Sequence, residues 1–389
     1  MKIATIVLSP ILYLLSFVFP KTSKIWLFGG WFGKRYADNS KDFFEYCNVQ
    51  KPKNEVKYIW IYKDKNLGRK LSTMPIESSY AYSFNGIWLQ LRAKIFITCI
   101  NSSDFIPFLI TRRNFFVQLW HGSPLKYIGI DSRKSRWRKT FDKVRFFLID
   151  NYDMVISPSP IVDNIFRSAF NCSKKSLVRA GYPRNENFRL EESKVLGIRQ
   201  FYGLSNKDKL VAYLPTHRRE GKGENPFRNE LKKLLLLNEM FKEKGVFVVV
   251  KPHFYEKDSL NDFREESNIL IRYELKHDLY EFLGATDALV TDYSSIILDY
   301  ELLGKEIHIY PFDINEYTKK DRELYHSFDQ IYSKVKNIVI SDSIEELTTN
   351  LTNIQNKRSG FLKQRTPYNM PLEEYSEAIY EELIKRLES

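Results

Sequence analysis

The stretch ALVTDYSSIILDYELLGKEIHIY, residues 288–310, decides the fold because it contains a complete strand, helix and strand in succession. The apolar runs at 288–292 and 306–310 have the length of short buried strands. Between them, 295–303 has the apolar spacing of a helix. Two strands joined through a helix lie parallel in one sheet. The stretch therefore predicts an α/β protein.

The same alternation continues along the chain in two series. Strands of the first series are expected at residues 24–29, 56–62, 94–100, 115–120 and 153–157. Further strands of the second series are expected at residues 209–214, 246–251 and 269–273. Helices are also expected at residues 38–47, 159–170, 229–244, 279–285, 343–355 and 372–387. Each series predicts a doubly wound parallel sheet of the Rossmann type.

The length and the N-terminus bound the organisation of the chain. Because 389 residues exceed what one hydrophobic core usually serves, we expect two α/β domains facing a central cleft. These domains are placed at 21–187 and 188–367, with a C-terminal segment at 368–389. Residues 1–20 are mostly apolar and predict a membrane-associating helix in the inner leaflet. A helix packed on the enzyme body and a cleaved signal segment are the alternatives.

Charge and cysteine content narrow the partners. The sequence carries 60 Lys and Arg against 48 Asp and Glu, a net charge of +12. This favours an anionic partner such as a nucleotide, a phosphopolymer or an acidic lipid. The basic residues are spread along the chain rather than gathered with aromatic residues, which disfavours nucleic acid. The three cysteines are far apart and no Walker, HExxH or CxxC pattern occurs, so we expect neither a metal nor a cofactor.

The motif VQLWHGSPLKYIGID, residues 117–131, begins as an apolar strand and turns at His121. Ligand-facing groups lie at the carboxyl ends of parallel strands, and an imidazole with a pKa near about 6.5 can accept a proton from a hydroxyl. Gly122 allows the backbone to approach a ligand, and Lys126 adds positive charge. His121 is therefore either a general base or a hydrogen-bonded structural residue.

Polar residues follow two strands of the second series in the same way. Lys251 and His253 follow the run VFVVV, and a histidine at this place in each domain suggests that both act on one ligand. Thr216 and Arg218 follow another strand in the segment LPTHR. Arginine suits bidentate contact with phosphate, whereas a solvated basic loop is the alternative.

The turn TDYSS leads into the helix expected at 295–303. Ser294 or Ser295 caps this helix, and its free N–H groups with two hydroxyls predict a phosphate site; an ordinary serine cap is the alternative. Asp292 and Asp299 are candidates to bind polyol or ribose hydroxyls, or to satisfy the helix N-terminus.

Taken in order, the segments WHGSPLKYIGID, GYPRNE, LPTHR, KPH and TDYSSIILDYELLGKEIHIYPFDINEY resemble the CDP-glycerol glycerophosphotransferase family of teichoic acid and capsule synthesis. Matching pieces extend over most of the chain. The resemblance implies a GT-B-like fold, with the acceptor domain first, the nucleotide domain second and a final helix that crosses back. The length is similar to that of the priming or short-extending enzymes of the family.

The resemblance also implies roles for these residues. His121 would be the general base on the acceptor hydroxyl, and His253 would donate to the diphosphate. The acceptor side would contain Gly122, Lys126 and Asp131. The donor phosphates would be held by Thr216, Arg218, Lys251, Ser294 and Ser295, with Asp292 and Asp299 near the polyol or ribose.

The implied reaction is attack on the β-phosphorus of CDP-glycerol with release of CMP. The implied acceptor is an undecaprenyl-diphosphate-linked saccharide or a phosphopolymer, at the cytoplasmic face of the bacterial membrane. The alternatives are a CDP-ribitol donor, a nucleotide-sugar glycosyltransferase of GT-B type, and a basic non-enzymatic protein that binds anionic polymer. His217 in PTHR departs from the family, which often has an aromatic residue there.

Overall fold

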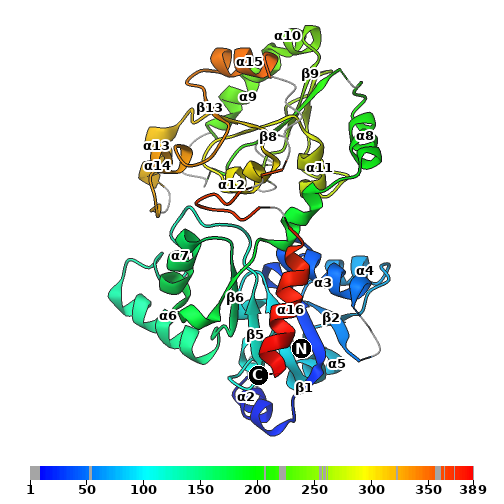
Figure 1. Cartoon of the computed structure of the whole chain (residues 1–389), viewed down its shortest axis with the longest axis vertical. Coiled ribbons are helices and arrows are strands. Elements are labelled where there is room, and N and C mark those ends of the chain that lie inside the picture. Colours follow the sequence, from blue (N-terminus) through cyan, green and yellow to red (C-terminus); the bar gives the residue numbers. More distant parts are fainter. Residues whose placement is uncertain are drawn as a thin grey trace. The chain divides into compact units, whose positions relative to one another are not determined.

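The computed structural model describes residues 9–51, 55–205, 207–218, 225–253, 256, 260, 262–320, 323–354, 361–362, 364–371 and 373–388. The chain forms two compact units. Unit 1 comprises residues 1–123, 127–186 and 373–389, and unit 2 comprises 124–126 and 187–372. Each unit contains a parallel sheet with helices packed on it (Figure 1).

Unit 1 is built on a seven-stranded sheet. Its strand order is β3 (Ser78–Tyr80), β2 (Lys57–Tyr62), β1 (Thr22–Gly29), β4 (Ala93–Thr98), β5 (Phe115–Gln118), β6 (Met154–Ser157) and β7 (Leu177–Arg179). All neighbouring strands are parallel, and Leu27 of β1 lies opposite Ile59 of β2 and Phe96 of β4. These central residues are buried, as in parallel sheets covered on both faces.

The helices of unit 1 begin and end at local sequence signals. They are α2 (Ser9–Val18), α3 (Asp38–Gln50), α4 (Lys65–Leu71), α5 (Phe84–Arg92), α6 (Arg136–Leu148), α7 (Pro160–Phe170) and α16 (Tyr375–Glu388). In α7, the Ser159 hydroxyl accepts a hydrogen bond from Val162 N and Pro160 occupies the first turn. Asn171 then ends the helix in the left-handed conformation, which asparagine tolerates.

Unit 2 is built on a six-stranded sheet. Its strand order is β10 (Ile269–Ile271), β9 (Val246–Val250), β8 (Lys209–Leu214), β11 (Ala288–Thr291), β12 (Glu306–Ile309) and β13 (Ile338–Ile340). All neighbours are again parallel, with Thr291 of β11 opposite Leu214 of β8 and Ile309 of β12. The predicted α/β class and the two parallel sheets are therefore confirmed.

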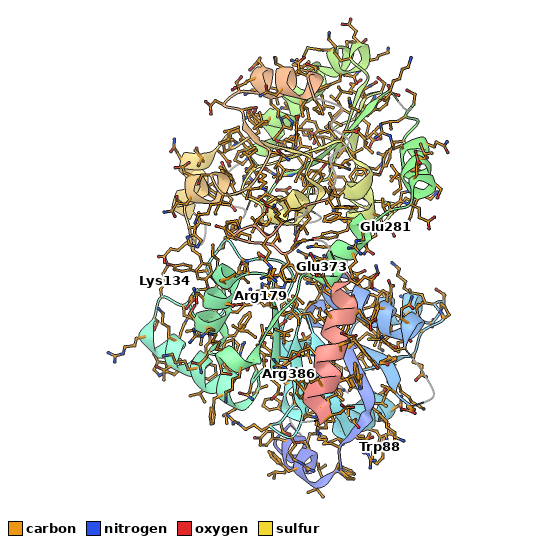
Figure 2. The ribbon with its side chains drawn as sticks, in the orientation of Figure 1. Trp88, Lys134, Arg179, Glu281, Glu373 and Arg386 are labelled. Carbon is orange, nitrogen blue, oxygen red and sulfur yellow. The ribbon has the colours of Figure 1, made fainter. Side chains whose placement is uncertain are left out.

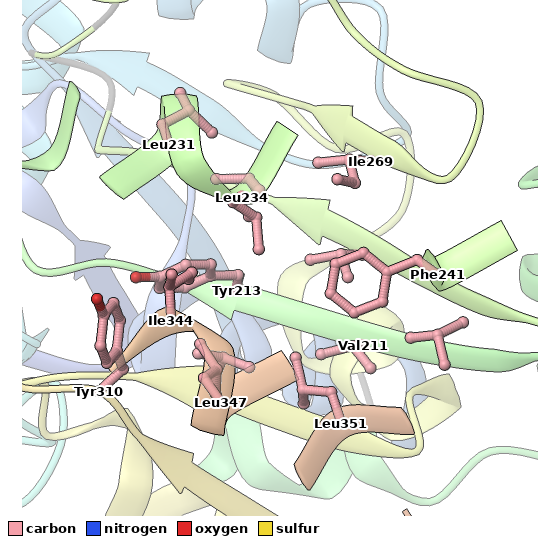
Figure 3. Packing of buried hydrophobic residues seen from close by; sticks show 14 of the residues in the cluster. Val211, Tyr213, Leu231, Leu234, Phe241, Ile269, Tyr310, Ile344, Leu347 and Leu351 are labelled. Carbon is pink, nitrogen blue, oxygen red and sulfur yellow. The ribbon is translucent and has the colours of Figure 1, made fainter. Parts of the chain in front are cut away.

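Helices cover the sheet of unit 2 and close its core. They are α8 (Glu192–Phe201), α9 (Phe227–Leu236), α10 (Asn238–Glu243), α11 (Leu279–Ala285), α12 (Ile296–Tyr300), α13 (Ile314–Lys320), α14 (Phe328–Tyr332) and α15 (Ile344–Thr352). Figure 3 shows the core on one side of the sheet, where Leu234 of α9 and Leu347 of α15 pack over Val211 of β8. These side chains are fully buried, which places the apolar stripe of each helix against the sheet.

Both sheets reverse their strand order at the centre. The reversal lies between β1 and β4 in unit 1 and between β8 and β11 in unit 2. In open α/β sheets, ligands bind beyond the carboxyl ends of the strands at this topological switch point. The turns after these four strands, and after the neighbouring β5 and β9, are therefore where a site is expected.

The last helix, α16, belongs to unit 1 and lies against its sheet (Figure 1). Glu186 holds the start of this helix, because its carboxylate accepts hydrogen bonds from Ser376 N at 2.6 Å and Ser376 Oγ at 2.7 Å. At the other end, Arg386, labelled in Figure 2, donates to Asp153 O at 3.0 Å. Polar contacts at both ends thus fix the helix on the sheet.

The prediction of a membrane-associating N-terminal segment at 1–20 is not supported. Residues 1–8 lie outside the described residues, and α2 has only ten residues. Its C-terminal turn packs on unit 1: Arg113 donates to Phe17 O, and the Phe19 ring contacts the Trp88 ring at 5.5 Å. Within the described ranges, no helix is both long enough and apolar enough to span a membrane.

The fit of α16 makes Gly181→Ala a sensitive test. A Cβ at Gly181 would lie 2.2 Å from Cζ of Tyr375, which is buried and cannot move away. We expect overpacking to lower the free energy of unfolding by about 1–3 kcal/mol, measured by denaturant titration. The matched control is Gly197→Ala in α8, where a Cβ meets nothing within 4 Å and alanine should stabilise the helix. Equal stability of the two variants would contradict this packing.

Candidate active site

The turn after β5 carries His121 in a conformation that the chain holds from several sides. Trp120 has φ = 55° and Gly122 has φ = 116°, a left-handed region that favours glycine. Trp120 N donates to Gln118 Oε1 at 2.9 Å, and Trp120 O accepts from Asn39 Nδ2 at 2.8 Å. Strained turns of this kind persist only where the surroundings impose them, and they concentrate at functional sites.

The imidazole of His121 is fixed in one orientation. Its Nδ1 lies 2.8 Å from the carbonyl oxygen of Cys99, in the turn after β4. Because a carbonyl can only accept, Nδ1 carries the hydrogen in this bond, and the neutral ring keeps its lone pair on Nε2. The rings of Trp120 and Trp31 lie 4.0 and 5.6 Å away, centroid to centroid. This arrangement prepares Nε2 to accept a proton.

Asp104 orders the turn that follows β1. Its carboxylate is fully buried and accepts hydrogen bonds from Phe32 N at 2.6 Å and from the Thr98 hydroxyl. Burial raises the pKa of Asp104 to about 6, while the hydrogen bonds from Thr98 and Phe32 act in the opposite direction. Asp104 thereby links the turn after β1, which contains Trp31, to the turn after β4.

The segment GYPRNE supports the same edge of unit 1. Arg184 Nη1 pairs with Asp38 Oδ1 at 2.8 Å, and Arg184 N donates to Asn39 Oδ1 at 3.2 Å. Asn39 in turn holds the Trp120 carbonyl, so the two segments brace the turn of His121. Sequence reasoning did not identify Asn39 or Asp104 as site residues, although Asp38 was considered as a helix cap.

The remaining residues expected on the acceptor side are placed differently. Gly122 adjoins the base, and Asp131 accepts a hydrogen bond from Ser168 Oγ at 2.6 Å. Lys126 belongs to unit 2, where its Nζ contacts the Tyr317 hydroxyl and lies 4.8 Å from the centre of that ring. The placement of Lys126 on the acceptor side is therefore corrected, because its partners lie in the other unit.

The switch point of unit 2 is organised by Asp292. This carboxylate is completely buried and accepts hydrogen bonds from Thr216 N at 2.9 Å, from the Thr216 hydroxyl, and from Tyr293 N at 2.6 Å. It also pairs with Arg218 Nη1 at 2.8 Å. With its oxygens occupied inside the protein, Asp292 joins the turns after β8 and β11. The prediction of a polyol or ribose contact is corrected for this residue.

Arg218 is likewise engaged within the protein. Its Nε and Nη2 each donate to Asp313 at 2.8 Å, and Nη1 contacts Asp292 and the Thr216 carbonyl. The guanidinium also lies within 5.2 Å of the ring centres of Tyr293 and Tyr317. The predicted phosphate contacts of Arg218 and Thr216 are corrected: both side chains hold the turn in shape.

Asp299 is corrected for the same reason. It is 2% exposed, and its Oδ2 accepts a hydrogen bond from the Tyr280 hydroxyl at 2.9 Å. Tyr280 lies in α11, so this bond ties α12 to the neighbouring helix. A buried carboxylate with an internal donor fits helix packing better than contact with a polyol.

Ser294 and Ser295 remain accessible at the start of α12. Both are partly exposed, and Ser294 Oγ accepts a hydrogen bond from Ile296 N at 3.3 Å. An accepted bond leaves the hydroxyl hydrogen of Ser294 able to donate. Ser295 has helical dihedrals and makes no side-chain cap bond. The two hydroxyls therefore sit beside the switch point with donors to offer to an anion.

Beyond β9, Lys251 and His253 lie partly exposed near His217. The His253 and His217 rings are 5.0 Å apart, centroid to centroid, with a tilt of 31°. His217 Nδ1 lies 3.5 Å from Glu256 Oε1, and burial raises the pKa of that carboxyl. His217 therefore faces the second predicted histidine, a contact that its place in the sequence did not reveal. Among the described residues no cluster of His, Cys, Asp and Glu could hold a metal ion.

These features define a class of protein. Two doubly wound units of GT-B-like type carry a poised imidazole in one unit, and hydroxyls, a lysine and histidines at the donor-type edge of the other. A family model for CDP-glycerol:poly(glycerophosphate) glycerophosphotransferases matches residues 11–383. The chain belongs to this family and is therefore an enzyme.

Individual proteins support this assignment. The chain is 28% identical over 320 residues to the teichoic acid poly(glycerol phosphate) polymerase of Bacillus spizizenii, covering 80% of this chain and 79% of that protein. It is 29% identical over 333 residues to the polymerase of the same name from Staphylococcus epidermidis, covering 79% of this chain but 43% of that protein. The solved structure of the wall teichoic acid polymerase TagF is similar in fold, with a TM-score of 0.79 and 21% identity over 99% of this chain and 96% of that chain.

The role of Arg218 can be tested directly. Arg218→Ala would leave Asp292 and Asp313 buried without their partner, so we expect a loss of about 3–5 kcal/mol in the free energy of unfolding of unit 2. The control is Arg228→Ala, which removes a pair with the exposed Asp262 and should change the melting temperature little. A stable Arg218→Ala variant with weaker donor binding alone would restore the phosphate contact first predicted.

Proposed function

We propose that this enzyme transfers glycerol phosphate from CDP-glycerol to a hydroxyl of a lipid-linked saccharide or (poly)glycerophosphate acceptor, with release of CMP, in teichoic acid or capsular polymer synthesis. The observation that carries the proposal is the bond between His121 Nδ1 and the Cys99 carbonyl. It orients a neutral imidazole as a base in a chain that belongs to a family of glycerophosphotransferases.

In the proposed reaction, the acceptor oxygen bonds to the β-phosphorus of the donor. The bond between that phosphorus and the bridging oxygen of CMP breaks, and the hydroxyl proton passes to His121 Nε2. Phosphoryl transfer requires positioning and charge stabilisation rather than covalent help from the protein. We assign this task to Lys251, His253 and the hydroxyls of Ser294 and Ser295, without a cofactor besides the donor.

The first experiment measures CMP release. With CDP-glycerol and a lipid-linked disaccharide or an oligo(glycerol phosphate) acceptor, the parent enzyme should release CMP only when acceptor is present. His121→Ala should lower kcat by about 10²–10⁴-fold, because a general base contributes that much. The control is His277→Ala, whose ring packs on Phe201 away from the predicted site residues and should leave kcat unchanged.

Other donors decide between the remaining functions. Release of CMP from CDP-ribitol but not from CDP-glycerol would assign the ribitol reaction. Release of a nucleoside diphosphate from a UDP-sugar, without CMP from either CDP-polyol, would assign a glycosyltransferase and contradict the proposal. Full activity of His121→Ala would remove the proposed base.

We also propose that the enzyme acts at the cytoplasmic face of the membrane through α6. Trp137, Phe141, Val144 and Leu148 follow one another at helical spacing, and all four are exposed, Trp137 by 75%. Basic residues surround this stripe: Arg133, Lys134, Arg136, Arg138, Lys139, Lys143 and Arg145. Lys134 is labelled in Figure 2, in the segment that leads into α6. An apolar stripe among cations suits the surface of an anionic leaflet.

A flotation assay with vesicles of phosphatidylcholine and phosphatidylglycerol tests this surface. The double variant Trp137→Glu and Phe141→Glu should lose most of the bound fraction, and added salt should weaken the binding of the parent enzyme. The control is Phe201→Glu, which changes an equally exposed apolar residue in unit 2. Unchanged flotation of the double variant would contradict a role for α6.

A further inference from the structure

A cavity of about 180 Å³ lies inside unit 1, beside the proposed base. Trp120 forms part of its lining, and the Trp120 ring is 4.0 Å from the His121 ring, centroid to centroid. A larger cavity of about 390 Å³ is lined by Lys57 and Tyr58 at the amino end of β2, the edge of the sheet opposite to the switch-point turns. The smaller cavity is therefore the one that adjoins the chemistry.

The motif that contains His121 also builds this cavity. Gly129 lines it with φ = 51°, and a Cβ at this position would lie 2.2 Å from the carbonyl oxygen of Ala169. The adjacent Ile130 N donates to that same oxygen at 2.9 Å. A side chain at Gly129 would therefore push the wall of the cavity away from α7. The proposed base accounts for only the first part of the motif, and the cavity gives the second part a task.

Two arginines bring positive charge to the cavity. Arg145 Nη2 pairs with Asp150 Oδ2 at 2.8 Å, while Asp150 Oδ1 accepts from Ser102 N and is thereby fixed. The buried Arg145 Nε has no hydrogen-bond acceptor among the residues that the structure describes. Arg133 Nε pairs with Asp142 at 2.5 Å, and its side chain is 42% exposed. Each guanidinium presents five donors, so a single carboxylate leaves others for a ligand.

The rest of the lining is aromatic and hydroxylic, with Phe146, Phe170 and Ser132 among its residues. A guanidinium fork in a partly apolar recess favours a small anion with several acceptor oxygens, because the low dielectric strengthens each charge-assisted bond. The volume is below the roughly 300–1,000 Å³ of sites for drug-sized ligands. It suits a single phosphate ester unit rather than a nucleotide.

We infer that this cavity binds a phosphodiester of the acceptor, one unit behind the hydroxyl that His121 deprotonates. The inference rests on the proposed function and deepens it. An acceptor that already ends in glycerol phosphate offers such a phosphate, whereas a lipid-linked saccharide without glycerol phosphate does not. The enzyme therefore extends a glycerol phosphate chain in preference to starting one, and Arg145 and Arg133 determine that preference.

The test measures binding directly, so that it does not depend on turnover. Isothermal titration with a lipid-free oligo(glycerol phosphate) should show binding to the parent chain. Arg145→Gln and Arg133→Gln should each weaken that binding about tenfold, the loss of one charge-assisted hydrogen bond. Arg167→Gln, at an exposed position of α7 in the same unit, is the matched control and should bind as the parent does.

A second titration separates the two sources of phosphate. A short-chain lipid diphosphate disaccharide without glycerol phosphate should bind the parent chain and both variants equally. Arginine-dependent binding of this compound would assign the cavity to the lipid diphosphate and overturn the preference for chain extension. Absence of oligo(glycerol phosphate) binding to the parent, or equal binding by all four proteins, would overturn the site itself.

Folding and activity are measured alongside. Arg133 is partly exposed, so Arg133→Gln should fold normally even if Arg145→Gln loses stability through Asp150. CMP release by the parent enzyme reports separately on the proposed function. In that assay the variants should lose kcat/KM about tenfold with oligo(glycerol phosphate) and less than about twofold with the saccharide acceptor, whereas a purely structural role would affect both acceptors alike.

Discussion

A buried carboxylate at each topological switch point is the interaction on which both edges depend. Asp104, beyond β4, accepts from the backbone of Phe32 in the turn after β1. Asp292, beyond β11, accepts from the backbone of Thr216 in the turn after β8. The two positions correspond, because the strand orders of the two sheets correspond. An ionised group is expensive to bury, so each carboxylate requires its donors and draws the diverging turns together.

This constraint separates residues that hold the turns from residues that can meet a ligand. The carboxylates and Arg218 are buried with internal partners, whereas His121, His253, Ser294 and Ser295 are partly exposed beside them. The same division appears around the cavity of unit 1, where Asp150 fixes Arg145 without using every donor of its guanidinium. Reactive groups thus gain a fixed position from neighbours that do not take part in the chemistry.

The sequence predicted the long, periodic elements well. The strand at 209–214 and the helix at 279–285 agree with β8 and α11 residue for residue. The strands β3, β7 and β13 were missed because three residues are too few to show a period. The helix predicted at 229–244 is two helices, since Asn238 turns to accept a hydrogen bond from Asn268 N. That bond joins residues 30 positions apart and leaves no local signal.

The sequence by itself determined the α/β class, the two series of strands and the chemical types that follow them, because apolar period and turn residues are local properties. It also identified His121 as a candidate base. Only the tertiary structure decided what each polar residue does. Whether Asp292 binds a polyol or the turn of Thr216, and whether Arg218 meets a phosphate or Asp313, depends on which strands become neighbours. Contacts between residues far apart in the chain set burial and partners, and these properties select among roles that one residue type allows.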